Sequence, residues 1–118
     1  MQEQLRELIT KHCATLEVEL EAVRLCVKRL ENHAVPAGQT IQEGIEVTHK
    51  IKGSSGSIGF ADISAASETL EHYFRSLPEN IETLDDEACQ KLAVHFQTLE
   101  QLVTTITPEN SSLFNVSL

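Results

Sequence analysis

The residues best suited to chemistry lie together in residues 48–59, which read THKIKGSSGSIG. His49 offers an imidazole nitrogen, which is a nucleophile and proton carrier near neutral pH. Lys52 and Gly53 follow three and four residues later, spacings that place all three on one face of a helix. A lysine beside the ring attracts a phosphate, and a glycine one turn away leaves the ring unshielded. The segment therefore indicates a nucleophile open to a bulky tetrahedral group or to another protein.

The apolar residues around His49 show where it points. They recur at helical spacing and predict one buried side, consisting of Ile41, Ile45, Thr48, Ile51, Ser55 and Ile58. An advance of about 100° per residue turns His49 away from that side and towards solvent, with Gly53 nearly in line. The remaining histidines lack such neighbours and are interpreted as solvated surface residues: His12, His33, His72 and His95.

Four amphipathic segments must position these residues, and no segment alternates long enough to be a strand. The second begins with Thr40 as N-cap and Glu43 completing a capping box. Pro36, Pro78 and Pro108 interrupt or end the helical pattern. The predicted helices cover residues 3–32, 40–59, 62–77 and 86–106. The first carries a single apolar stripe made by Leu5, Leu8, Ile9, Leu16, Leu20, Val23, Val27 and Leu30.

Short connections between amphipathic helices imply antiparallel neighbours. We therefore predict an all-α fold, an up-and-down antiparallel four-helix bundle over residues 1–107. Residues 108–118 form a C-terminal tail that either frays or packs across the end of the bundle, and the sequence leaves both possibilities open. Met1 and this irregular tail favour a stand-alone protein over a domain of a larger kinase.

Composition excludes several classes of protein. The 118 residues fit one domain, and a net charge of −9 argues against generic nucleic-acid binding, which needs a basic face. No apolar run approaches the ~20 residues of a membrane span, and the first residues lack the apolar core of a signal peptide. We expect a cytoplasmic monomer. The three widely spaced cysteines form neither a metal-ligand pair nor a disulfide framework.

Residues 48–71 also resemble a known family, the histidine phosphotransfer (HPt) domains of bacterial-type multistep phosphorelays. The family pattern is H-x-[Leu/Ile]-K-G-[Ser/Ala]-[Ser/Ala]-x-x-x-G, followed by an apolar residue and, further on, Leu-Glu. The chain matches it without a gap through His49, Ile51, Lys52, Gly53, Ser54, Ser55, Gly59, Ile63, Leu70 and Glu71. Thr48 stands where the family often has alanine, a core position that accepts either residue by size.

The resemblance implies a phosphocarrier rather than an enzyme. His49 would accept a phosphoryl group from the phospho-aspartate of a receiver domain and relay it to another response regulator. Lys52 would stabilise that group, Gly53 would give steric access, and Glu71 would hydrogen-bond the other ring nitrogen. The implied partners are response-regulator receiver domains, a hybrid sensor histidine kinase, or both. Receiver docking would involve exposed residues around His49, namely Gln42, Glu46, Lys50 and Gly56.

No cofactor of its own is expected, since Mg²⁺ would sit on the receiver. Lys52 precedes its glycine, the reverse of a phosphate-binding P-loop, so autokinase activity from ATP is not expected.

Two alternatives stay open. The first is a docking module that binds receiver or kinase domains without carrying phosphate. The second is a metal-binding bundle, because Glu46 and His49 have the Glu-x-x-His spacing of di-iron proteins. Such sites need a second motif, which the sequence lacks, and an inward-facing histidine, so we predict no metal site.

Overall fold

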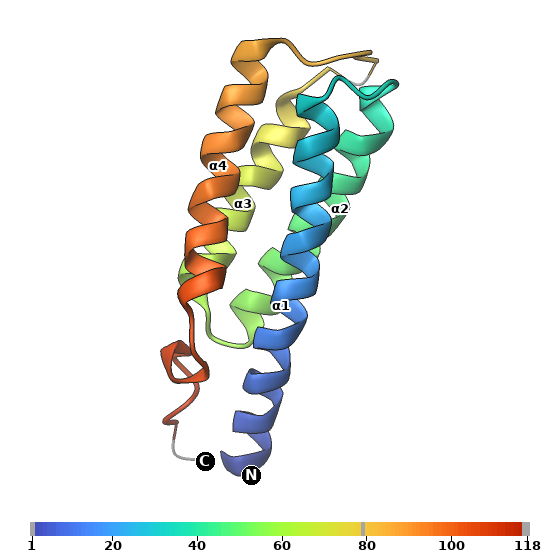
Figure 1. Cartoon of the computed structure of the whole chain (residues 1–118). Coiled ribbons are helices and arrows are strands. Elements are labelled where there is room, and N and C mark those ends of the chain that lie inside the picture. The colour runs from blue at the N-terminus through green and yellow to red at the C-terminus, as the bar shows by residue number, and fades with distance from the viewer. Residues whose placement is uncertain (1, 79, 117–118) are drawn as a thin grey trace.

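The computed structural model describes residues 2–78 and 80–116. It contains α1 (Gln2–Glu31), α2 (Ala37–Ser57), α3 (Ala61–Ser76), α4 (Asp86–Thr105) and the short 3₁₀ helix η1 (Pro108–Asn110). The four α-helices alternate in direction along a rod of about 50 × 20 × 19 Å (Figure 1). No strand occurs in residues 2–78 or 80–116. The prediction of an all-α, antiparallel four-helix bundle is confirmed.

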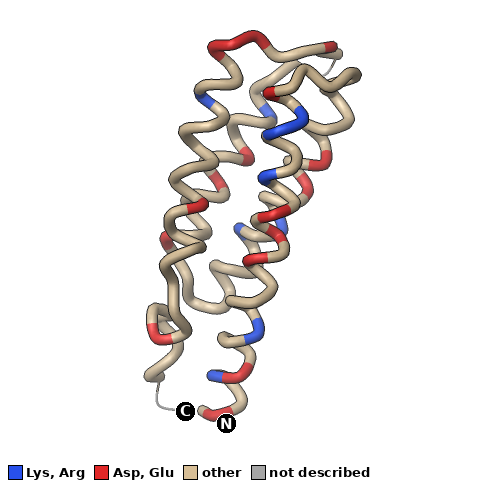
Figure 2. Tube along the Cα trace, viewed as in Figure 1, with Lys and Arg blue, Asp and Glu red and all other residues tan. Residues whose placement is uncertain are grey.

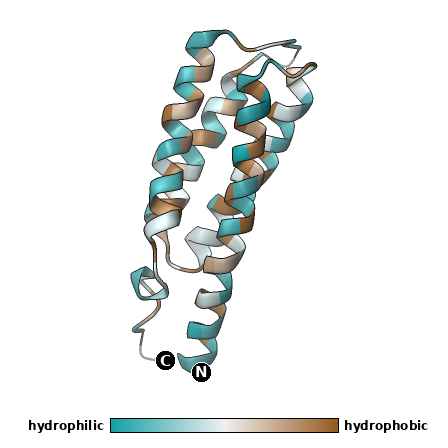
Figure 3. Ribbon diagram, in the orientation of Figure 1, coloured by the Kyte–Doolittle hydropathy of each residue, from teal (hydrophilic) through white to brown (hydrophobic). Residues whose placement is uncertain are grey.

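The core is mostly aliphatic, with Phe60, Phe74 and Phe96 among its residues. Hydrophobic residues recur along each helix with hydrophilic ones between them (Figure 3). On α2 the predicted inward residues Ile41, Ile45, Thr48, Ile51 and Ser55 are all buried. The buried Thr48 hydroxyl donates to the Gly44 carbonyl at 2.7 Å, so it brings no unsatisfied polar group into the core. This packing fixes the rotation of α2 and therefore the direction in which His49 points.

The apolar stripe predicted for α1 is wrong at Leu8, which is 56% exposed, whereas Glu19 is buried. The first turns of α1 extend beyond the turn between α2 and α3, so fewer neighbours surround them (Figure 1). Periodicity gives the direction of a side chain, but the length of the neighbouring helices decides whether it is covered.

The predicted start of the second helix is also wrong. The helix begins at Ala37, with Pro36 in the N-cap position, and Thr40 lies buried inside it. The capping box with Glu43 therefore does not form. The first helical N–H, that of Ala37, instead donates to the Glu82 carbonyl in the α3–α4 connection at 2.9 Å. A tertiary contact thus satisfies one of the first N–H groups of the helix, which have no partner within it.

The C-terminal segment packs across the end of the bundle as far as residue 116. The Ser111 hydroxyl donates to the Ile58 carbonyl at 2.6 Å, and the Ser112 N–H donates to the Gly59 carbonyl at 3.0 Å. The Arg6 guanidinium donates to the Phe114 carbonyl at 2.9 Å and lies 4.4 Å from its ring centroid. These contacts tie the end of the chain to the first turns of α1 and to the turn that follows α2.

Acidic and basic residues differ in number and in their distribution over the helices (Figure 2). Acidic residues outnumber basic ones two to one, and five of the nine Lys and Arg residues lie on α1. Within the described residues, no helix is both long enough and apolar enough to cross a membrane.

Candidate functional site

His49 stands on the outer face of α2, and its side chain is 65% exposed, as predicted. Its Nδ1 atom lies 3.1 Å from Oε2 of Glu71, which comes from the neighbouring helix α3. The side chain of Glu71 is only 7% exposed. One side of the imidazole is therefore held by a nearly buried carboxylate, while the rest of the ring faces solvent.

Arg75 completes this contact, because its Nε–H donates to the same Glu71 oxygen at 2.9 Å. Burial raises the pKa of Glu71, but hydrogen bonds and charge from Arg75 and His49 outweigh burial, so the net shift is downward. Glu71 is thus ionised at neutral pH. Its other oxygen, Oε1, is buried without a hydrogen-bond partner among the described residues.

The ionised carboxylate fixes the tautomer of the neutral imidazole. A carboxylate only accepts hydrogen bonds, so Nδ1 of His49 carries the hydrogen and donates it to Glu71. The lone pair then resides on Nε2, the nitrogen on the far side of the ring. When the imidazole is neutral, the arrangement presents a nucleophile with its reactive atom turned away from the bundle.

Gly53 leaves the surface beside His49 open. A Cβ at this position would meet nothing within 4 Å. Lys52 is half-buried and takes part in none of the ion pairs formed in residues 2–78 and 80–116. Its position one turn after His49 keeps the ammonium group within reach of a group bound at the ring.

The residues predicted to dock a receiver fall into two groups. Gln42, Glu46 and Gly56 are exposed at helical spacing on the same side of α2 as His49. Lys50 is 74% exposed, but its ammonium lies 3.7 Å from Glu19 on α1, so it lies on the α1 side of α2, opposite to Glu71. Lys50 therefore lies at the edge of any surface centred on His49.

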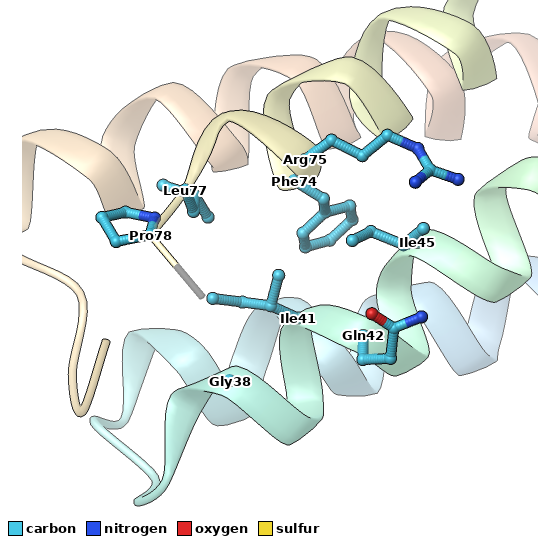
Figure 4. A pocket seen from close by; sticks show the side chains of 8 residues that line it. All are labelled: Gly38, Ile41, Gln42, Ile45, Phe74, Arg75, Leu77 and Pro78. Carbon is cyan, nitrogen blue, oxygen red and sulfur yellow. The ribbon is translucent and has the colours of Figure 1, made fainter. Parts of the chain in front are cut away.

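A shallow groove of about 300 Å³ lies between the first half of α2 and the end of α3. Figure 4 shows the Phe74 ring pointing from α3 towards α2, next to Ile45, with Arg75 extending along the rim. The groove therefore adjoins the side of the bundle on which Arg75 reaches Glu71.

Sequence reasoning missed Arg75. Its signal is the spacing of four residues from Glu71, which is typical of an acid–base pair on one helix. The interpretation of His12 and His95 as solvated residues is also wrong, since both are half-buried. His12 Nε2 lies 3.1 Å from the Ser55 hydroxyl, and its ring stacks on Phe60 at 5.9 Å. Burial lowers the pKa of His12.

The outward direction of His49 bears on the metal alternative. An inward-facing ligand set needs the histidine in the core, whereas His49 is exposed and its Nδ1 is engaged by Glu71. Within the described residues, no three His, Cys, Asp or Glu side chains gather closely enough to hold a metal ion.

The comparison with protein families addresses the whole bundle. The sequence pattern of the Hpt domain matches residues 3–107, a span that includes nearly all of the four α-helices. The chain belongs to the Hpt domain family. Members of this family are helical bundles that act in histidine phosphotransfer within phosphorelays. Neither the curated proteins nor the solved structures compared with the chain give a significant match.

Proposed function

We propose that this Hpt domain accepts a phosphoryl group on Nε2 of His49 from the phospho-aspartate of a receiver domain and relays it to another response regulator. The observation that supports this most directly is the contact between His49 Nδ1 and Glu71, which leaves Nε2 as the free nucleophile on an exposed face.

In the proposed step, the Nε2 lone pair of neutral His49 attacks phosphorus in line. The bond between phosphorus and the aspartyl oxygen breaks, and the aspartate leaves as a carboxylate. Nδ1 keeps its hydrogen, so the phosphorylated ring becomes positively charged next to the Glu71 carboxylate. The reverse step, with the aspartate of a second receiver as nucleophile, passes the group on.

The remaining residues assist this transfer by charge and by access. Lys52 stabilises the phosphoryl group electrostatically, and Gly53 leaves room for the receiver backbone next to the ring. Receiver domains, a hybrid sensor histidine kinase, or both would dock on Gln42, Glu46 and Gly56 with Lys50 at the edge. The receiver would supply Mg²⁺, and the chain would not phosphorylate itself from ATP. Its cytoplasmic location and monomeric state stay predictions.

A transfer assay tests the proposal. Receiver domains carrying labelled phosphate are mixed with wild type, with His49→Gln and with His72→Gln. The last is a matched control, because His72 is also exposed and near a glutamate on α3. Acid-labile, base-stable label on wild type and His72→Gln but not on His49→Gln is expected. A chain that binds the receivers and takes up no label would contradict the proposal and favour the docking module.

A further inference from the structure

Gly44 on α2 faces the Phe74 ring of α3 at very short range. A Cβ built on Gly44 would lie 2.6, 2.8 and 2.9 Å from three atoms of the Phe74 ring, far inside ordinary contact. Phe74 is completely buried, and its ring points from α3 into the space between the two helices (Figure 4). The ring occupies the volume that any other side chain at position 44 would need.

This close approach lies near the contact between His49 and Glu71. Gly44 precedes His49 by five residues and Phe74 follows Glu71 by three, which correspond to about 7.5 Å and 4.5 Å along their helices. On the other side of the site, a Cβ at Gly56 would lie 3.2 Å from the Ser64 hydroxyl oxygen. The site therefore lies between two places where a glycine on α2 lets α3 come close.

We propose that Gly44 is a positioning residue for phosphotransfer. Because it has no side chain, the Phe74 ring lies directly against the α2 backbone, and this sets the helix separation at which Glu71 reaches Nδ1 of His49. The inference deepens the proposed function. Its expected effect on the rate of phosphate transfer rests on that function, whereas its expected effect on the His49 tautomer does not. Gly44 touches neither the phosphoryl group nor the receiver in this scheme, and it acts through Phe74 and Glu71.

The distances indicate how sensitive the contact is. Restoring an ordinary contact of 3.4 Å between a Cβ at position 44 and the ring requires a displacement of about 0.8 Å. If α3 moved by that amount, the 3.1 Å contact between His49 and Glu71 would lengthen to about 3.9 Å, which is no longer a hydrogen bond. The imidazole would then lose the partner that fixes its tautomer.

The test compares Gly44→Ala with a rescue variant and a control. In Gly44→Ala/Phe74→Leu the shorter side chain makes room for the new Cβ. In Gly53→Ala, a control for the tautomer measurement alone, the same substitution is made on the same helix, where a Cβ meets nothing within 4 Å. The His49 tautomer is read from its ¹⁵N imidazole shifts, and unfolding in urea shows whether each variant is folded.

Wild type and Gly53→Ala are expected to hold the hydrogen on Nδ1, and Gly44→Ala is expected to lose that preference. Gly44→Ala should also transfer phosphate at least fivefold more slowly with unchanged KM, as expected for the loss of one charge-assisted hydrogen bond on an exposed ring. The double variant should regain both properties. If Gly44→Ala does not fold, the double variant is still expected to fold with the hydrogen on Nδ1.

A folded Gly44→Ala that keeps the Nδ1 hydrogen would overturn the inference, because the ring would then have moved into the adjoining groove and left the contact unchanged. A folded double variant without the Nδ1 preference would overturn it too. A wild-type chain that has the Nδ1 hydrogen and accepts no phosphate would instead remove the proposed function, while the positioning by Gly44 would stand.

Discussion

Replacing Glu71 by glutamine keeps the shape of the contact with His49 and removes its charge. In the wild type, the His49 ring gains positive charge when Nε2 bonds to phosphorus. Its Nδ1 atom lies 3.1 Å from the Glu71 carboxylate oxygen, which stabilises this charge. In Glu71→Gln an amide oxygen can still accept the hydrogen bond, so the tautomer is retained. The carboxylate charge that stabilises the developing imidazolium is lost.

The expected size follows from hydrogen-bond energies. Bonds to charged groups contribute about 1.5–3 kcal/mol and neutral ones about 0.5–1.5 kcal/mol, a difference of roughly 1 kcal/mol or more. The His49 side chain is 65% exposed, so water screens the charge and the lower end applies. A loss of about 1 kcal/mol slows transfer about fivefold. Glu71→Leu, which cannot accept the hydrogen bond, should be slower still.

The assay is single-turnover transfer from a phosphorylated receiver at saturating receiver concentration, with folding checked by urea titration. Glu68→Gln is the matched control, since Glu68 lies on the same helix and its ion pair is with the exposed His72 at 3.7 Å. Its rate should equal that of the wild type. Equal rates for wild type, Glu71→Gln and Glu71→Leu would refute the role of the carboxylate in orienting and stabilising the ring.

Three further predictions concern access, backbone strain and pH. Gly53→Gln should slow phosphate transfer at least tenfold, because its side chain would cover the open surface beside His49. The urea concentration needed for unfolding should stay the same or rise slightly, since glutamine favours helix over glycine by up to about 1 kcal/mol. Equal transfer rates for wild type and variant would contradict the role of Gly53 in access. Gly59→Ala should lower the free energy of unfolding by about 2 kcal/mol or more, because φ is +93° and a Cβ would lie 2.6 Å from Ser111 Oγ. A free energy of unfolding equal to that of the wild type would count against this strain. Burial lowers the pKa of His12 below its usual 6.5, so the folded state binds fewer protons than the unfolded state, and the free energy of unfolding should fall as the pH drops below about 6.5. His12→Gln should flatten this part of the plot of unfolding free energy against pH. An unaltered slope would exclude His12 as its source.

Sequence periodicity was sufficient for the fold and for the direction of His49. The apolar spacing on α2 gives its buried side, and every residue predicted there except the half-buried Ile58 is buried. The proline positions gave the ends of helices to within a few residues. The exception is the start of α2, where the Ala37 N–H finds its acceptor at Glu82, 45 residues away in the chain. No local pattern encodes such a contact.

The sequence predicted only part of the candidate site. A single helix wheel shows that His49 faces outward, but it does not show which residue of another helix reaches its ring. Gly44 faces Phe74 across the space between α2 and α3, where a Cβ would lie 2.6 Å from the ring, a distance that only packing sets. Arg75 binds Glu71 within α3 at 2.9 Å, but the sequence does not show that this pair lies beside His49 on α2. Likewise, Lys50 was grouped with the docking residues as an exposed residue next to His49, whereas its ammonium lies 3.7 Å from the buried Glu19 on α1.

The most direct test of the account is to locate the phosphoryl group itself. The ¹⁵N-histidine-labelled chain is incubated with a phosphorylated receiver, and one-bond coupling between phosphorus and nitrogen is measured by NMR. The account predicts coupling to Nε2 of His49 alone, with Nδ1 still protonated and facing Glu71. Phosphate on Nδ1, on another histidine, or on no residue of a chain that binds the receiver would contradict it.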